Sequence, residues 1–178
     1  VEQNWTKAVE WYTKAAENGH TDAMYNLGYG FHQGEGDEQN LAKAVEWYTK
    51  AAEKGHSDAM YNLGECFWKG EGVEQNWTKA AEWYTKAAEK GHSDAMFNLG
   101  ECFEKGKGVE QNWTKAIEWY TKAAENGHTD AMYILGYCFW MLPRDLLPFS
   151  QNWQNEAKAA EWYTKAAEKG HSAAMYNI

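Results

Sequence analysis

The chain has 178 residues, of which 44% are hydrophobic and 24% are charged, a composition typical of a folded domain. Its formal net charge of -9 argues against a nucleic-acid partner, because phosphate binding requires a clustered positive surface. No stretch approaches the ~18 to 20 consecutive apolar residues that span a bilayer, and no charged leader with an apolar run opens the chain. Basic or neutral partners are therefore favoured.

A unit of 36 residues recurs along the chain, and it is marked by equivalent tryptophans at 11, 47, 83 and 119, with another at 162. Each unit predicts two helices, and a lone pair of this kind cannot cover its own apolar stripe, so neighbouring units must stack. The sequence predicts one repeat domain over 1–178. It would hold a partial unit at 1–18, regular units at 19–54, 55–90 and 91–126, a unit with a seven-residue insertion at 127–169 and a truncated unit at 170–178.

The first helix of each unit is predicted to begin at a hydroxyl residue whose side chain caps the first turn. These residues are Thr21, Ser57, Ser93 and Thr129. An Asp follows each of them, which is favourable near the positive end of a helix. The apolar stripe of the first complete unit has the spacing of a buried helix face. It consists of Met24, Leu27, Gly28 and Phe31.

The second helix of each unit is predicted to begin at an asparagine cap, at Asn40, Asn76 or Asn112. In the first complete unit it would bury Ala44, Tyr48, Ala51 and Ala52 and stop at Gly55. The chain begins within a second helix, at 4–18, and ends within a first helix, at 171–178. Both ends are thus expected to expose apolar surface, and end-to-end self-association is expected.

Three motifs follow one another in register: A-x-x-x-L-G-x-x-F, then G-x-G-V, then K-A-x-x-W-Y-x-K-A-A-x-x-G. This pattern resembles the Sel-1-like repeat, a relative of the tetratricopeptide repeat, and the match covers nearly the whole chain. The resemblance implies an all-α fold, a right-handed superhelical solenoid of antiparallel helix pairs whose first helices line the concave side. It also implies an adaptor or scaffold that binds a protein or peptide.

Three equivalent positions of the first helix change drastically between units. They hold Tyr29, Glu65, Glu101 and Tyr137, then His32, Trp68, Glu104 and Trp140, and then Gln33, Lys69, Lys105 and Met141. Their spacing places them on one face of the helix, predicted to lie roughly opposite the apolar stripe. A recognition surface is one interpretation, and unconstrained drift of exposed residues is the other. Recognition is favoured, because Trp, Tyr and Met are poor choices for a neutral surface.

An asparagine falls beside this face in the first three complete units. Its amide can pair with a peptide backbone, or, alternatively, it can bond a neighbouring helix end. The predicted protein- or peptide-binding set is Tyr25, Asn26, Tyr29, His32, Tyr61, Asn62, Glu65, Trp68, Lys69, Phe97, Asn98, Glu101, Glu104, Tyr133, Tyr137, Trp140 and Met141. The acidic excess of this face predicts a partner that carries Lys or Arg together with apolar or aromatic anchors.

The fourth complete unit carries an apolar insertion with Leu142, Leu146, Leu147 and Phe149. Insertions in solenoids fall in loops and often mark a binding face. Two interpretations remain for these side chains. They either pack back onto the solenoid or form an exposed anchor, for a partner or for self-association through the loop.

The three cysteines, Cys66, Cys102 and Cys138, occupy equivalent positions one unit apart. Equivalent helices in a stack lie about 8–10 Å or more apart, beyond the ~7 Å Cα separation that a disulfide tolerates. Free and mostly buried thiols are therefore predicted. They mildly favour a reducing compartment, although the sequence names no localisation. The cysteine-rich branch of the family carries two cysteines per unit, and this chain departs from that pattern.

Histidines also recur one unit apart, at His20, His56, His92, His128 and His171. Zinc needs its ligands on one centre at about 2 Å each, so we predict caps at the turns between units and no metal site. No G-x-S-x-G, phosphate-loop or H-E-x-x-H motif occurs. We therefore predict no enzyme activity, no catalytic residue and no cofactor. Two alternatives stay open: a duplicated or engineered scaffold without a dedicated ligand, and β-lactam or peptidoglycan-related binding as in the cysteine-rich relatives, which the missing cysteines disfavour.

Overall fold

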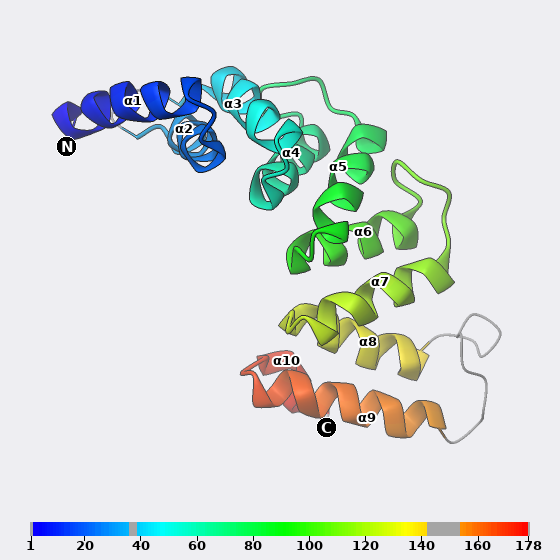
Figure 1. The fold of residues 1–178 in the computed structure, drawn as a ribbon. Coiled ribbons are helices and arrows are strands. Elements are labelled where there is room, and N and C mark those ends of the chain that lie inside the picture. Colours follow the sequence, from blue (N-terminus) through cyan, green and yellow to red (C-terminus); the bar gives the residue numbers. More distant parts are fainter. Residues whose placement is uncertain (1, 36–38, 142–153, 178) are drawn as a thin grey trace. The chain divides into compact units, whose positions relative to one another are not determined.

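The computed structural model in Figure 1 describes residues 2–35, 39–141 and 154–177. In these residues all regular secondary structure is α-helical, as predicted. The helices are α1 (Glu2–Glu17), α2 (Thr21–Gln33), α3 (Leu41–Glu53), α4 (Ser57–Lys69), α5 (Trp77–Glu89), α6 (Ser93–Lys105), α7 (Trp113–Glu125), α8 (Thr129–Met141), α9 (Gln154–Glu168) and α10 (Ser172–Tyr176). None of these helices is both long and apolar enough to cross a bilayer.

The chain forms two compact units, Val1–His92 (the N-unit) and Ser93–Ile178 (the C-unit), and each is described by itself. In the N-unit, each first helix packs along the second helix of its own repeat, α2 on α3 and α4 on α5. Second helices α1 and α3 also contact the first helix that follows them. The C-unit repeats this arrangement with α6 on α7 and α8 on α9. Each unit is therefore a stack of helix pairs, the arrangement of an α-solenoid.

One buried tyrosine per repeat forms the centre of each helix pair, and the glycine facing it lets the helices approach. Tyr84 is fully buried against Gly64, where an added Cβ would lie 2.6 Å from the tyrosine ring. Tyr120 and Gly100 repeat the same contact in the C-unit, also at 2.6 Å. Overpacking of such a site forces side chains out of their preferred rotamers. The glycine is thus a packing requirement of every repeat.

Asparagine caps begin the second helices as predicted. The backbone N–H of Lys79 donates to Asn76 Oδ1 at 2.9 Å, and Lys115 donates to Asn112 Oδ1 at 3.0 Å. The predicted buried positions of α3, at Ala44, Tyr48, Ala51 and Ala52, are all buried. The sequence therefore located these helices correctly.

The prediction that a Ser or Thr caps the first helices is wrong, because the preceding histidine holds that position. His56 has extended backbone (φ -72°, ψ 114°), and its Nδ1 accepts from the N–H of Ala59 at 3.3 Å. His128 accepts from Ala131 in the same way at 3.2 Å. Ser57 is already helical and donates its hydroxyl to Asp58 Oδ1 at 3.3 Å. The prediction that the histidines act as turn caps is confirmed at these residues.

The turn after a first helix depends on glycine for two different reasons. Gly70 ends α4 in the left-handed region, with φ 77°. Gly72 has φ 73°, and a Cβ there would lie 2.3 Å from the carbonyl oxygen of Leu41. The turn of one repeat thus lies directly against the start of α3 in the repeat before it, and only glycine fits.

Candidate interaction surface

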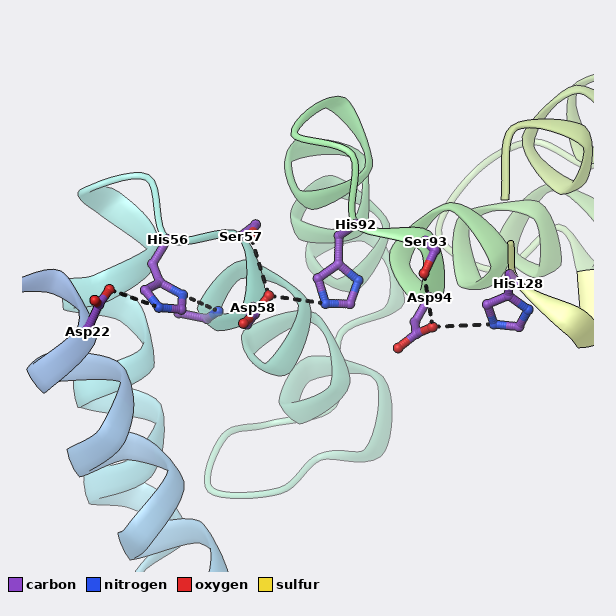
Figure 2. Close-up of polar contacts among 9 residues, drawn as sticks. Asp22, His56, Ser57, Asp58, His92, Ser93, Asp94 and His128 are labelled. Atoms are coloured by element: carbon purple, nitrogen blue, oxygen red, sulfur yellow. Dashed lines mark hydrogen bonds and ion pairs between the residues drawn. The ribbon is translucent and has the colours of Figure 1, made fainter. Parts of the chain in front are cut away.

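A contact of three side chains joins successive first helices in the N-unit, and Figure 2 shows its polar part. The Tyr25 ring stacks on the His56 ring at 4.6 Å between centroids, and His56 Nε2 lies 3.5 Å from Asp22 Oδ1. Tyr61 stacks on His92 at the same separation, and His92 lies 3.5 Å from Asp58. His56 therefore caps α4 and at the same time contacts two side chains of the preceding first helix.

The C-unit repeats these contacts. Phe97 stacks on His128 at 4.6 Å, and Tyr133 stacks on His171 at 4.5 Å. Asp94 lies 3.5 Å from Nε2 of His128 (Figure 2). The four aromatic members of the predicted binding set at this position thus have one ring face occupied by a histidine. Their structural role is to join repeats.

The asparagine beside the variable face lies near tyrosines. The Asn62 side chain is close enough to the hydroxyls of Tyr25 and Tyr48 to affect their pKa. Burial raises the pKa of both tyrosines, and the Asn62 contact lowers it in part. Asn26 and Asn98 are half-buried at the equivalent positions.

One of the three variable positions does not lie opposite the apolar stripe. His32 follows Met24 by eight residues, and at 100° per residue this places it only about 80° from Met24. His32 Nδ1 lies 3.4 Å from the hydroxyl of the buried Tyr48. Trp68, its equivalent, is half-buried with its ring 6.4 Å from that of Tyr84. The position of His32 and Trp68 therefore borders the core. The exposed variable face of these first helices is narrower than the sequence predicted.

The carboxylates of the face differ in how they are neutralised. Glu65 accepts from the hydroxyl of Tyr84 at 2.6 Å and pairs with Lys69 Nζ at 2.6 Å. Glu101 pairs with Lys105 at 2.6 Å. Lysines four residues along the helix thus offset two of the three glutamates.

Glu104 has a neutral partner. Its Oε2 accepts from the hydroxyl of Tyr120 at 2.5 Å, and in the part of the chain that the structure describes it forms no ion pair. Burial raises the pKa of Tyr120, and the hydrogen bond to Glu104 raises it further. Tyr120 therefore remains a hydroxyl donor, and its hydrogen bond fixes the position of the Glu104 carboxyl group.

Helix α8 presents a different surface at the same three positions. Tyr137, Trp140 and Met141, which we call the α8 patch, are 47%, 64% and 57% exposed. Tyr29, in the first complete repeat, is the other strongly exposed aromatic residue at these positions. Single exposed apolar side chains are ordinary, but three on one helix face form a candidate contact surface.

The structure adds residues that the sequence reasoning missed. Tyr84 and Tyr120 orient glutamates of the surface from behind, and the signal was available, because a buried tyrosine hydroxyl usually needs a partner. The loop residues proposed as an anchor lie outside the described residues. These are Leu142, Leu146, Leu147 and Phe149.

The three cysteines are free and buried, as predicted. Burial raises the pKa of each thiol to about 12. A thiolate is the reactive form of cysteine. These thiols are therefore inert packing groups and provide no nucleophile.

Stacked helix pairs with a repeating glycine–tyrosine core define a tetratricopeptide-like α-solenoid, and the comparisons identify the family. The Sel1 repeat model matches residues 1–20, 21–56, 57–92, 93–128, 129–147 and 150–171, so the chain belongs to the Sel1 repeat family. Proteins of this family are generally non-catalytic scaffolds for protein interactions. A sequence comparison with curated proteins gives no significant match.

Solved structures similar to this chain share the repeat. A protective antigen of uropathogenic Escherichia coli is 34% identical with a TM-score of 0.83, over 93% of this chain and 34% of its own length. A Sel1 repeat protein from Oxalobacter formigenes is 34% identical with a TM-score of 0.80, over 94% of this chain and 64% of its own. Cysteine-rich protein B of Helicobacter pylori is 29% identical with a TM-score of 0.61, over 76% and 97%. The chain thus spans a third to two thirds of the first two relatives.

Proposed function

We propose that this chain is a protein- or peptide-binding module that uses the exposed face of its first helices, with the α8 patch as its main apolar anchor. The observation that carries the proposal is the exposure of Tyr137, Trp140 and Met141. At the positions of Tyr137 and Met141, α4 and α6 hold glutamates and lysines that pair with each other. Aromatic side chains and methionine are enriched where proteins meet.

The charges of the surface favour a partner with basic as well as apolar side chains. Aspartates line the same edge of the first helices α2, α4, α6 and α8, and their carboxylates are mostly exposed, as at Asp22 and Asp130. Each faces the Nε2 atom of a histidine, and none faces a lysine ammonium group in the residues that the structure describes. A complementary positive partner would be steered toward this edge.

No observation favours the alternative of β-lactam or peptidoglycan-related binding. The chain has a single buried free cysteine in each of three repeats. We therefore assign no catalytic residue, no cofactor and no metal ligand. Binding through the first helices, without chemistry, is the function that the surface supports best.

The test is capture of interacting proteins from a native lysate by the wild-type chain and by the triple variant Tyr137→Ser, Trp140→Ser, Met141→Ser. The control is Trp11→Ser, which removes an equally exposed indole (67%) from second helix α1. The triple variant is expected to lose the proteins that the wild type and the control retain, with an unchanged melting temperature. Retention of the same proteins by the triple variant would refute this assignment of the surface.

A further inference from the structure

A cavity of about 390 Å³, which we call the α9 cleft, lies in the C-unit where α8 meets α9. Its lining residues come from α8, α9 and the end of α10, and they are Trp140, Glu156, Ala159, Ala160, Tyr163 and Asn177. We propose that the α9 cleft binds an amphipathic helix of a partner protein, with an apolar side chain against Trp140 and Ala160 and a lysine or arginine against Glu156. The proposal rests on the proposed function, because Trp140 also belongs to the α8 patch, and it names the chemistry of the partner.

Helix α9 exposes a position that the preceding second helix buries. Ala160 is exposed, whereas its equivalent on α7, Ile117, is only 2% exposed. Both second helices pack on the first helix of their own repeat, so that contact does not account for the difference. Helix α7 is also covered by the following helix α8, while α9 is followed by α10, which has five residues. A helix that lies against α9 as α8 lies against α7 would therefore bury Ala160.

The walls of the α9 cleft suit an apolar side chain from outside. Ala159 and Tyr163 are buried in the fold, at 4% and 2% exposure, and line the cavity. Trp140 lines it from α8 and is still 64% exposed, so much of its indole is open to a ligand. Cavities of roughly 300–1,000 Å³ with mainly apolar walls are typical of binding sites. The cleft is therefore large enough to receive side chains of a partner.

Glu156 adds a negative charge to the lining. The equivalent first residues of α5 and α7 are Trp77 and Trp113. Glu156 is exposed, and in the part of the chain that the structure describes the ion pair on α9 joins Glu161 to Lys165 and none reaches Glu156. A helix that docks here thus meets a carboxylate where the other repeats have an indole.

The repeats indicate which end of the docked helix lies at Glu156. In the N-unit, the turn after α4 lies so close to the start of α3 that only glycine fits at Gly72, against the carbonyl oxygen of Leu41. Leu41 is the first residue of α3 and is equivalent to Glu156. A helix docked on α9 in the same orientation would end beside Glu156. Because the C-terminal end of a helix carries partial negative charge, a basic residue in its last turn offsets both that end and the carboxylate.

The test begins with the selection of helix-forming peptides, displayed on phage, against the full chain. Selected peptides are expected to carry apolar residues three or four positions apart and a lysine or arginine in the last turn. Fluorescence anisotropy then measures one selected peptide, and its analogue with norleucine in place of the basic residue, against the wild type, Ala160→Leu and Glu156→Gln. Ala157→Leu, at an exposed position of α9 outside the lining, is the matched control.

Ala160→Leu is expected to weaken the selected peptide about tenfold or more, because the larger side chain occupies the cavity. Ala157→Leu should leave the affinity unchanged. Equal affinities for the wild type and Ala160→Leu would overturn the α9 cleft as the binding site. A proline in the middle of the peptide should abolish binding, and retained binding would overturn the helical conformation of the occupant.

Glu156→Gln is expected to weaken the selected peptide about two- to fivefold, as the loss of an exposed ion pair does. The norleucine analogue should lose as much on the wild type and nothing further on Glu156→Gln, since both changes remove the same pair. A glutamate in the first turn also stabilises its own helix. If that were its only role, Glu156→Gln would lower the melting temperature and leave the affinity unchanged, which would overturn the basic partner.

A further variant separates the α9 cleft from the proposed function. Tyr137→Ser with Met141→Ser changes the α8 patch outside the lining and should leave the affinity for the selected helix unchanged. Peptides that depend on this double variant but not on Ala160→Leu would overturn the α9 cleft and leave the proposed function standing. If no helix is selected, the α9 cleft is overturned, whereas capture from the lysate still decides the proposed function.

Two other occupants are outcomes of the same measurements. A peptide with the sequence of α6 that binds as tightly as the selected helices would make a second copy of this chain the occupant and would overturn a separate partner. Leu146→Ser with Leu147→Ser, in the segment outside the described residues, is expected to leave the affinity unchanged. A clear gain in affinity would make the chain's own insertion the occupant and would overturn the proposal.

Discussion

Helices α4 and α8 occupy equivalent places in their repeats, yet they present opposite surfaces. On α4, Glu65 is held by Tyr84 and Lys69, while on α8 Tyr137 and Met141, at the positions that match Glu65 and Lys69, are exposed. Behind both helices the packing is the same, since an added Cβ at Gly64 or at Gly136 would lie 2.6 Å from a tyrosine ring. We infer that the helix pairs depend on a few contacts that recur in each repeat, such as the glycine–tyrosine packing, so the exposed residues of the first helices can differ between repeats.

The largest expected effect tests whether the scaffold is equivalent in the two units. Tyr84→Ala and Tyr120→Ala each remove a fully buried ring. Each is expected to lower the free energy of unfolding by about 3–5 kcal/mol, as large aromatic truncations do. Urea denaturation followed by circular dichroism measures both. Costs that differ by more than about 2 kcal/mol would show that the repeats are not equivalent.

Alkaline pH should destabilise both units through the buried thiols. Because burial raises the pKa of Cys66, Cys102 and Cys138 to about 12, the folded chain keeps these protons after the unfolded chain has lost them near pH 8.5. The contribution of the protonated, buried thiols to the free energy of unfolding is fully present below pH 8.5. This contribution is lost as the pH rises toward 12, because the unfolded chain then gives up the protons that the folded chain keeps. Between pH 8.5 and 9.5 the loss is about 1 kcal/mol per thiol.

The measurement is the urea midpoint as a function of pH for the wild type and for a variant with all three cysteines changed to alanine. The variant should be less stable at pH 7 but lose less stability on going from pH 8.5 to 9.5. Equal slopes for the two proteins would contradict the burial of the thiols.

A smaller effect is expected from closing the space in front of the tyrosine ring. Gly64→Ala and Gly100→Ala place a Cβ 2.6 Å from Tyr84 or Tyr120, and the ring must move. Each is expected to cost about 1–3 kcal/mol. Thermal melts would detect this loss of stability. Gly91→Ala cannot serve as a control, because Gly91 has φ 89° and an alanine there would be strained for a different reason. An unchanged melting temperature for either variant would show that the ring moves freely.

The smallest expected effect is a difference in stability between the same substitution, tyrosine to phenylalanine, made in the N-unit and in the C-unit. Tyr84→Phe leaves Glu65 with Lys69, whereas Tyr120→Phe leaves Glu104 without its hydroxyl partner. Tyr120→Phe is therefore expected to cost about 1 kcal/mol more. Paired urea titrations measure the difference. A larger cost for Tyr84→Phe would reverse the comparison between the two surfaces.

The repeat length and the helix pattern were sufficient to predict most of the fold. The asparagine caps at Asn76 and Asn112 and the buried residues of α3 were located correctly, because capping and periodicity are local properties of the sequence. The choice of cap on the first helices was wrong. His56 and Ser57 both carry an acceptor, and only the backbone conformation decides which of them precedes the helix.

The candidate surface was harder to predict, because its charges depend on contacts between helices. The Glu65–Lys69 and Glu101–Lys105 pairs follow from helix spacing and were overlooked. The bond from Tyr120 to Glu104 joins residues on two helices and could not be derived from spacing within one of them. The exposure of Trp140, compared with the half-burial of Trp68, also depends on the neighbours of each residue.

The central claim is that ligands bind to the exposed face of the first helices, and in the C-unit to α6 and α8. Amide chemical shifts of the isotope-labelled full chain, recorded as a protein captured from the lysate by the wild type is added, test it most directly. The account predicts that the largest changes fall at Tyr137, Trp140 and Met141. Changes concentrated on the exposed positions of second helices α7 and α9, with those residues unaffected, would contradict it.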